Sequence, residues 1–220
     1  RSLIWDEAAG RWQIETAGGD SLRARVVVLG VGGLHLPRYP EIPGLRQFAG
    51  PAFHSARWRH DVDLAGKRVA VIGSGASAVQ IVPAIAPQVQ SLAVFQRTPP
   101  WVLPRNDRPI SPALQRAFAR VPALQRLWRW ILYLRQESIA IAYTVKPKLL
   151  GSWQKQSMQL IYRSVSDPLT RHKLWPHYPL GCKRALLSDD YYPAFERDHV
   201  DLITEPISEI RGQSIVTADG

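Results

Sequence analysis

The stretch VIGSGASAVQ, residues 71–80, decides the fold class of this 220-residue chain. It contains the pattern G-x-G-x-x-A and follows an apolar, β-branched run that we expect to form a strand, at 68–72. The residues after it are expected to form a helix, at about 77–86, and a second strand, at 91–95. Together they make a βαβ unit of about thirty residues. A glycine turn that joins a strand to a helix inside such a unit is typical of dinucleotide-binding α/β domains.

Each position of this turn has a physical role in holding a pyrophosphate. Gly73 permits the tight turn, Gly75 lets the phosphates approach the backbone, and Ala78 allows the helix to pack closely on the strand. The helix N-terminus adds free N–H groups and a partial positive charge, and Ser74 and Ser77 can add hydroxyl donors. We therefore predict a doubly wound, Rossmann-like domain. The alternative is a glycine turn in an α/β domain that binds no ligand.

The end of the second strand indicates which dinucleotide binds. A site for NAD needs an Asp or Glu there, to hold the 2′-hydroxyl of the ribose. This strand runs into FQRTPP, where Gln96 supplies no charge, whereas Arg97 and Thr98 suit a 2′-phosphate. These residues favour NADP over NAD; the alternative is a lone surface arginine.

A later loop, GCKRALL, places two cations side by side. One of Lys183 and Arg184 could reach the 2′-phosphate and the other a developing oxyanion, or the two could be a solvated pair. Cys182 beside them could be a nucleophile whose thiolate the cations stabilise. No His or Asn is placed by a motif to complete such a site, so we do not assign Cys182 the chemistry.

The rest of the chain predicts short strands and a helical insertion. Apolar residues three and four apart predict amphipathic helices from about 112 to 175. We expect this insertion to pack on the sheet; the alternative is that Trp128 and Trp130 face a partner or make a peripheral membrane contact. No stretch is apolar enough to span a bilayer. The β-branched run 26–29 predicts a buried strand.

Composition limits the class of protein further. The net charge of +10 could indicate nucleic-acid binding, but the arginines are scattered rather than clustered, so no nucleic-acid partner is expected. The single cysteine excludes a disulfide framework and a multi-cysteine metal site, and we assign no metal ligands. It also fits a reducing compartment, which predicts a cytoplasmic protein.

An aromatic segment, FAGPAFHSARW, precedes the glycine turn. It reads F-x-G-x-x-x-H-x-x-x-W, with Phe48, Gly50, His54 and Trp58 at the fixed positions. A Pro-rich stretch, LPRYPEIPG, comes before it and is expected to be an extended linker.

These motifs, in this order, resemble type I Baeyer–Villiger monooxygenases, which belong to the wider class of flavin-containing monooxygenases. The resemblance rests on LPRYPEIPG, FAGPAFHSARW, GSGASA and FQRTPPW, and on a Lys-Arg pair followed by Tyr-Tyr at 191–192. It covers nearly the whole chain. One departure is Arg59, where the family usually has Pro or Asp after the fingerprint tryptophan.

The resemblance implies a reaction and a division into domains. In the family, FAD and NADPH occupy separate doubly wound domains, and one oxygen atom of O2 is inserted next to a ketone carbonyl to give an ester or lactone. We therefore expect small-molecule ketone and O2 as substrates. The expected division is a strip of the FAD-binding domain at 1–36, the linker and fingerprint at 37–63, the NADP-binding domain at 64–204, and the start of a return to the FAD-binding domain at 205–220.

The resemblance also implies residue roles. Arg184 matches the catalytic arginine that stabilises the oxygenating intermediate, and the fingerprint residues would form a hinge. Lys183, Arg97 and Thr98 match contacts to the 2′-phosphate. The phosphate turn consists of Gly73, Ser74, Gly75, Ser77 and Gln80.

Two other functions stay open from the sequence. One is a flavin monooxygenase that oxygenates nitrogen or sulfur, and the other is a non-catalytic dinucleotide-binding module. The chain has one G-x-G-x-x-[GA] turn, whereas the family has a second for FAD. We therefore expect this chain to be an internal fragment that is inactive and retains no FAD by itself.

Overall fold

The computed structural model describes residues 2–34 and 36–220 of the chain and divides it into two compact units. The smaller unit comprises Arg1–Pro40 and Ala52–Arg59, and the larger comprises Glu41–Pro51 and His60–Gly220. The chain therefore passes between the units three times within about twenty residues. The two units are described separately below.

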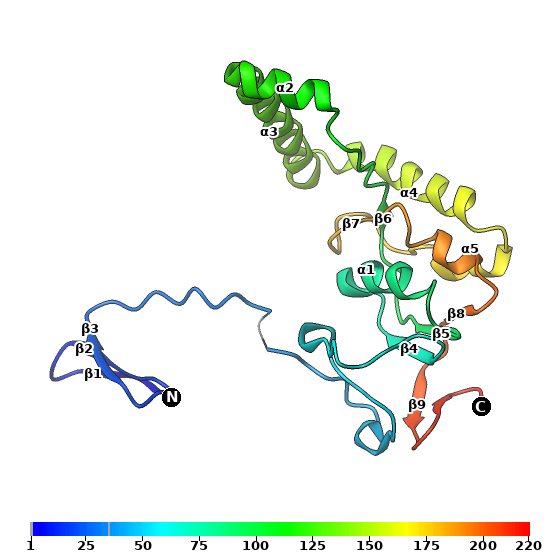
Figure 1. The fold of residues 1–220 in the computed structure, drawn as a ribbon, viewed down its shortest axis with the longest axis horizontal. Helices are drawn as coiled ribbons and strands as arrows, with labels where there is room; N and C mark the ends of the chain where they lie inside the picture. The colour runs from blue at the N-terminus through cyan, green and yellow to red at the C-terminus, as the bar shows by residue number, and fades with distance from the viewer. Residues whose placement is uncertain (1, 35) are drawn as a thin grey trace. The chain divides into compact units, whose positions relative to one another are not determined.

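The smaller unit contains an antiparallel sheet of three strands in the order β1-β2-β3 (Figure 1). The strands are β1 (Ser2–Asp6), β2 (Arg11–Glu15) and β3 (Ser21–Ala24). Trp5 pairs with Trp12 across β1 and β2, and their rings meet edge to face at 5.4 Å between centroids. A 3-10 turn, η2 (Ser55–Arg57), also belongs to this unit.

The prediction of a buried strand at 26–29 is wrong. These residues have no regular secondary structure, and Val26 and Val28 are 75% and 88% exposed. A buried strand needs neighbours for its backbone and for both faces, and among the described residues nothing pairs with this run. Its apolar, β-branched composition was a signal of strand propensity, which is realised only where a sheet is available.

A parallel three-stranded sheet lies at the centre of the larger unit, in the order β4-β5-β8. Strands β4 (Arg68–Ile72) and β5 (Ser91–Phe95) have the predicted bounds, and helix α1 (Ala76–Ile85) connects them. Strand β8 (Val200–Ile203) joins the other edge of β5. The predicted α/β class with a βαβ unit and a parallel sheet is confirmed.

The core of this sheet is made by the apolar residues of α1 and β5. Val79 and Val82 on the helix and Leu92 and Val94 on the strand are buried almost completely. The helix continues to Ile85 past Pro83, which lies inside it. The βαβ unit therefore presents the turn between β4 and α1 beside a packed helix–strand core.

The predicted helical insertion is present as four helices. They are α2 (Pro112–Arg120), α3 (Pro122–Thr144), α4 (Gly151–Ser164) and α5 (Pro168–Leu174), with a 3-10 turn η3 (Pro147–Leu150) before α4. The short strands β6 (Val102–Leu103) and β7 (Leu186–Leu187) pair in parallel. In the sequence, β6 precedes the insertion and β7 follows it. Strands β9 (Ile207–Ile210) and β10 (Ile215–Thr217) form an antiparallel pair, and 3-10 turns occur at η1 (Leu45–Gln47) and η4 (Pro193–Glu196).

The expectation that the insertion packs on the sheet holds for α5 but is wrong for most of α3, and α4 packs on strand β6. Helix α5 is attached to the sheet, because the Lys173 ammonium donates to the Leu202 carbonyl at 3.3 Å. Every residue at 121–138 is exposed, and Figure 1 shows α2 and α3 extending away from the sheet. Only the end of α3 is covered, where Ala142 packs in a cluster with Trp101, Leu150 and Leu180. No helix of the described residues is long and apolar enough to cross a membrane.

Gly44 fixes the linker segment to the end of strand β9. Its φ of 75° is left-handed, and a Cβ at this position would clash with the Ile210 carbonyl oxygen. The Ile210 amide also donates to the Pro43 carbonyl at 2.8 Å. Only glycine permits this close approach, which anchors the end of the Pro-rich stretch to the larger unit.

Candidate functional site

The predicted phosphate turn is open on the side where a ligand would approach. Gly73 has a φ of 113°, and its amide donates to the Phe95 carbonyl at 2.9 Å, which joins the turn to the end of β5. A Cβ built on Gly73 or Gly75 would meet no atom within 4 Å. Helix α1 has no acidic residue in its first turn to neutralise the positive end of its dipole. The backbone here can accept a pyrophosphate without rearrangement.

The polar side chains of the turn differ in how they are used. The Ser74 hydroxyl donates to the Thr98 carbonyl at 2.8 Å, so its proton is engaged within the protein. Ser77 and Gln80 are exposed near the start of α1, and the Gln80 amide donates to the Ala76 carbonyl at 3.0 Å. Ser77 is therefore exposed at the start of α1, whereas Ser74 links two loops.

The end of β5 carries no acid, and its polar residue is buried. Gln96 is 3% exposed, and its side-chain amide donates to the Lys173 carbonyl of α5 at 2.8 Å. Arg97 is exposed and makes no ion pair with a carboxylate of the described residues. The strand end therefore offers an uncompensated cation rather than the carboxylate that a 2′-hydroxyl would need.

Tyr178 connects the loop after β5 to the loop that contains Lys183. Its hydroxyl donates to the Pro99 carbonyl at 2.9 Å, and its own carbonyl accepts from the Trp101 indole at 2.9 Å. The Lys183 ammonium lies 5.0 Å from the centroid of the Tyr178 ring, within cation–π range. The structure thus gathers the predicted Arg97–Thr98 loop and Lys183 around one tyrosine.

Sequence reasoning missed Tyr178. The residue lies in a WPHYP stretch that carries no motif of its own, and its contacts are with residues almost eighty positions earlier. Burial raises the pKa of the Tyr178 hydroxyl, against a smaller lowering by the Trp101 backbone, so the hydroxyl is protonated and can act as a donor at neutral pH.

Arg184 and Cys182 are both exposed in the same loop. Arg184 forms no ion pair with a carboxylate of the described residues, so its charge is available to an anionic group. No cluster of three or more His, Cys, Asp or Glu residues that could hold a metal occurs in the part of the chain that the structure describes.

The fingerprint residues are divided between the two units. In the larger unit the Phe48 ring lies against Gly50, where a Cβ would come within 2.7 Å of the ring. In the smaller unit His54 caps η2, because its Nδ1 accepts from the Ala56 amide at 3.0 Å. Trp58 packs edge to face with Phe53, at 5.2 Å between centroids. Each fingerprint residue therefore has a local structural contact in its own unit.

His54 also contacts the Pro-rich stretch. The backbone amide of His54 donates to the Tyr39 hydroxyl at 3.3 Å, and the two rings meet edge to face at 5.6 Å between centroids. The histidine thus connects the two parts of the smaller unit, residues 1–40 and residues 52–59.

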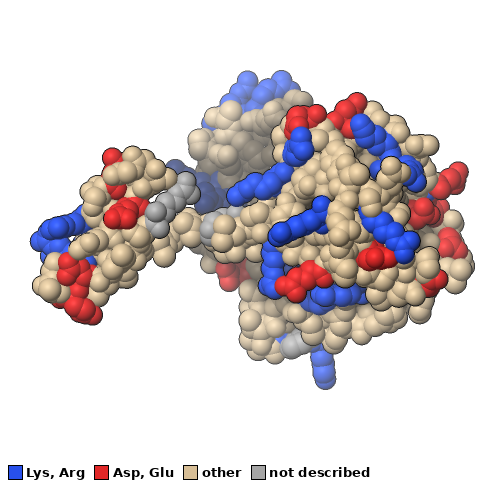
Figure 2. All heavy atoms as spheres, turned by 90° about the horizontal axis from the view of Figure 1, so that it is seen from below, with Lys and Arg blue, Asp and Glu red and all other residues tan. Residues whose placement is uncertain are grey.

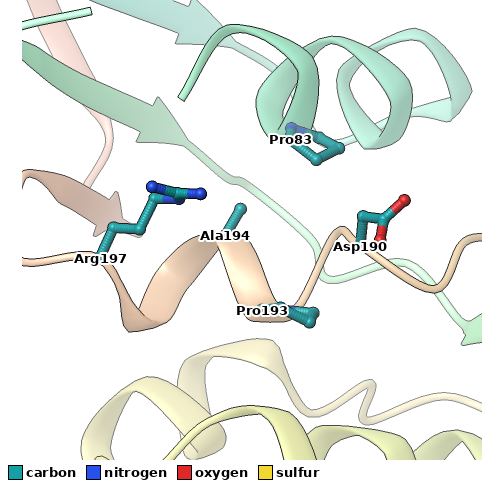
Figure 3. Close-up of a pocket in the computed structure, with 5 residues that line it drawn as sticks. All are labelled: Pro83, Asp190, Pro193, Ala194 and Arg197. Atoms are coloured by element: carbon teal, nitrogen blue, oxygen red, sulfur yellow. The ribbon is translucent and has the colours of Figure 1, made fainter. Parts of the chain in front are cut away.

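A shallow cavity of about 220 Å³ lies between α1 and η4, away from the predicted site residues. Figure 3 shows Pro83 on the helix facing Ala194 and Pro193, with Asp190 and Arg197 at its two sides. No residue of the phosphate turn, and none of Arg97, Thr98, Lys183 or Arg184, lines it. The candidate site is therefore the open turn surface and not this cavity.

Charges of both signs are mixed on one face of the molecule. On the face shown in Figure 2, Lys and Arg side chains are interspersed with Asp and Glu. A nucleic-acid site would need its cations gathered along one face or groove, so this face offers no such footprint.

Comparisons with known proteins agree with the motifs. The flavin-binding monooxygenase-like family matches residues 6–120, just over half of the chain. A Baeyer-Villiger monooxygenase of Pseudomonas aeruginosa is 45% identical over 99% of the chain and 41% of its own length. A Baeyer-Villiger monooxygenase of Streptomyces coelicolor is 48% identical over 100% of the chain and 42% of its own length. The chain thus spans about two fifths of the length of these curated relatives.

Solved structures are similar over the same extent. Cyclohexanone monooxygenase with bound epsilon-caprolactone superposes with a TM-score of 0.82 and 26% identity, covering 100% of this chain and 50% of that one. OTEMO in complex with FAD and NADP superposes with a TM-score of 0.80 and 27% identity, covering 100% of this chain and 49% of that one.

Proposed function

The chain belongs to the flavin-binding monooxygenase-like family, and from this we propose that the whole protein is an FAD- and NADPH-dependent monooxygenase of the Baeyer–Villiger type. It would insert one oxygen atom of O2 next to a ketone carbonyl and give an ester or lactone. The names of the relatives from Pseudomonas and Streptomyces support this reaction, and the FAD and NADP in the OTEMO structure support the cofactors. The residues of this chain would supply the NADP-binding part.

The observation that carries the proposal is an open phosphate turn beside two uncompensated cations. The turn at Gly73 and Gly75 leaves room for a pyrophosphate at the positive end of α1. Arg97 and Lys183, whose loops meet at Tyr178, offer positive charge for a 2′-phosphate. NADPH, when bound here, would supply the hydride for the reaction.

Arg184 is proposed as the catalytic residue. A fixed guanidinium favours the anionic form of a reacting oxygen over its protonated form, and it stabilises negative charge that develops during the transfer. Its exposed position next to Lys183 supports this role, because the cation that binds the cofactor and the cation that serves the chemistry would then be adjacent in the chain.

The fingerprint is proposed to act as a hinge. Phe48 and Gly50 belong to the larger unit, whereas His54 and Trp58 belong to the smaller one, so the motif straddles the division of the chain. The local contacts of these residues would hold the passages between the units in defined conformations. The division into domains at 1–36, 37–63, 64–204 and 205–220 stays a prediction. A cytoplasmic location is proposed from the single free thiol, Cys182.

Replacing Arg97 tests the preference for NADPH. In the whole protein we expect Arg97→Ala to raise the KM for NADPH about tenfold or more, because a charge-assisted hydrogen bond to phosphate contributes about 1.5–3 kcal/mol. The KM for NADH should change much less. Arg163→Ala, which removes an exposed arginine at the end of α4, is the matched control and should leave both values near wild type. Equal losses for the two cofactors in Arg97→Ala would refute the 2′-phosphate role.

Product analysis distinguishes the proposed reaction from its alternatives. NADPH oxidation that depends on a ketone and yields an ester supports the Baeyer–Villiger reaction. N-oxide or S-oxide as the sole product would assign the protein to the heteroatom-oxygenating class instead. NADP binding without any dependence of turnover on Arg184 would indicate a non-catalytic module.

A further inference from the structure

The two cations proposed for the 2′-phosphate come from loops that are distant in the sequence. Arg97 follows β5, before the helical insertion, and Lys183 precedes β7, after it. Neither cation is held by a carboxylate among the residues that the structure describes. Something else must fix the two loops relative to one another if they are to bind one phosphate group.

The loop that carries Arg97 has few backbone donors. Pro99 and Pro100 follow Thr98 directly, and neither has an amide hydrogen to donate. The loop is instead held through its carbonyls by two side-chain hydroxyls. Ser74 donates to the Thr98 carbonyl at 2.8 Å, and Tyr178 donates to the Pro99 carbonyl at 2.9 Å.

Tyr178 holds the second loop with its ring. The Lys183 ammonium lies 5.0 Å from the ring centroid, so the face of the Tyr178 ring attracts this cation. The hydroxyl of the same side chain holds the loop that carries Arg97. The tyrosine is itself oriented, because its carbonyl accepts from the Trp101 indole and the two rings meet edge to face at 6.4 Å. Its hydroxyl thus contacts the Arg97 loop, and its ring contacts Lys183.

We propose that Tyr178 and Ser74 are positioning residues for the 2′-phosphate and thereby set the preference for NADPH over NADH. Ser74 connects the pyrophosphate turn to the Arg97 loop, and Tyr178 connects that loop to Lys183. The inference rests on the proposed use of NADPH. It assigns the discrimination between NADPH and NADH to the hydroxyls of Ser74 and Tyr178 as well as to the two cations.

The test uses the whole protein and measures the ratio of kcat/KM for NADPH to that for NADH. Tyr178→Phe removes the hydroxyl but keeps the ring, and we expect the ratio to fall about threefold to tenfold. Tyr178→Leu removes both and should lower it further. Ser74→Ala should lower the ratio by an amount similar to Tyr178→Phe, because each removes one of the two bonds that hold the Arg97 loop.

A binding measurement without turnover isolates the phosphate. Affinities for adenosine 2′,5′-bisphosphate and for adenosine 5′-monophosphate are measured by calorimetry, since the two probes differ only in the 2′-phosphate. The Tyr178 variants should weaken the first probe and have little effect on the second. Combining Tyr178→Leu with Lys183→Ala should cost less than the sum of the single changes, because both act on the same cation.

The chain offers a matched control in Tyr162. The Arg171 guanidinium lies 5.1 Å from the Tyr162 ring centroid, so this is a second cation–π pair in the larger unit but outside the site. Tyr162→Phe and Tyr162→Leu should leave the NADPH-to-NADH ratio and both probe affinities at the wild-type values. Thermal melting of every variant shows whether a change in the ratio accompanies a loss of fold.

The outcomes separate the inference from the proposed function. If Arg97→Ala lowers the ratio and the Tyr178 and Ser74 variants do not, the positioning role is overturned while the use of NADPH stands. If the Tyr178 variants weaken both probes equally, the tyrosine is structural only and the inference is also overturned. If neither Arg97→Ala nor Lys183→Ala changes the ratio, the proposed 2′-phosphate site itself fails.

Discussion

Ser157 is a fully buried polar residue whose hydroxyl supports a strand carbonyl. It donates to the Val102 carbonyl of β6 at 2.7 Å. The carbonyls on either side of it in the chain, at Trp101 and Leu103, accept from amides at the β7 side. Because successive carbonyls of a strand alternate in direction, the Val102 carbonyl faces α4 and takes its hydrogen bond from the Ser157 hydroxyl.

Ser157→Ala is therefore expected to lower the free energy of unfolding by about 1–3 kcal/mol, the cost of leaving a buried acceptor unpaired. Denaturant unfolding of the variant and the wild type measures the difference. Ser152→Ala on the same helix is the control, because Ser152 is exposed and its hydroxyl bonds only to its own helical turn. We expect a change below about 0.5 kcal/mol there. Similar losses at both serines would contradict the special role of Ser157.

At the same scale, the sequence could identify the groups that act on a ligand but not those that hold them. Gly73 and Arg97 have local signals, since the turn pattern and the strand end place them. The partner of Ser74 across 24 residues and the contacts of Tyr178 across 79 exist only in the folded chain. Spacing therefore predicted Ser74 as a phosphate donor, whereas the structure shows that its proton is engaged with the Thr98 carbonyl.

Helix α5 begins at a capping carboxylate. Asp167 accepts from the Thr170 amide and from the Thr170 hydroxyl, both at 2.7 Å, and Pro168 follows it at the first helical position. These hydrogen bonds, with smaller contributions from neighbouring groups, hold the pKa of Asp167 below its ordinary value. Helix α5 also carries the Lys173 carbonyl that accepts from the Gln96 side-chain amide, so the cap supports the helix that contacts the end of β5.

The lowered pKa of Asp167 predicts a defined pH dependence. A carboxylate with a depressed folded pKa adds stability above its unfolded pKa, and this contribution is lost as the pH falls through the folded value. The difference in free energy of unfolding between wild type and Asp167→Ala should be largest at neutral pH and should shrink below about pH 4. Denaturant titrations at several pH values measure it. Asp167→Asn, which keeps a capping oxygen, should lose less than Asp167→Ala. A difference between wild type and Asp167→Ala that is constant with pH would contradict the assignment.

Helix α3 shows what periodicity does and does not determine. The three-and-four spacing predicted a helix with an apolar face, and α3 is indeed helical from 122 to 144. Periodicity says nothing about what covers that face, and Trp128 and Trp130 are 47% and 61% exposed among the described residues. A peripheral membrane contact through this face stays a prediction. Vesicle sedimentation of the whole protein would test it.

For the molecule as a whole, the sequence predicted the larger unit better than the smaller one. Strands β4 and β5 and the helix between them are encoded locally by apolar runs and a glycine turn, and they pack on one another. The run 26–29 has an equally strong strand signal, but the described residues offer it no sheet. A strand is a pairwise structure, so its prediction from one segment is only as good as the knowledge of its neighbour.

A polypeptide of residues 1–220 is expected to bind NADP but to retain no FAD. Its single glycine turn of this type serves one dinucleotide, and the chain spans about two fifths of the length of its curated relatives. The purified polypeptide should therefore lack flavin absorbance and should not oxidise NADPH, with the whole protein as the positive control. A yellow, active polypeptide would refute this.

The bond between Tyr178 and Pro99 closes a long excursion of the chain, across 79 residues that include four helices. The entropy lost by closing a loop grows only with the logarithm of its length, so doubling the excursion costs about 0.6 kcal/mol. The two ends of the excursion can thus stay fixed while the exposed part of α3, at 122–138, is lengthened or shortened. In evolutionary terms, the exposed part of α3 is where insertions and substitutions should be tolerated most readily.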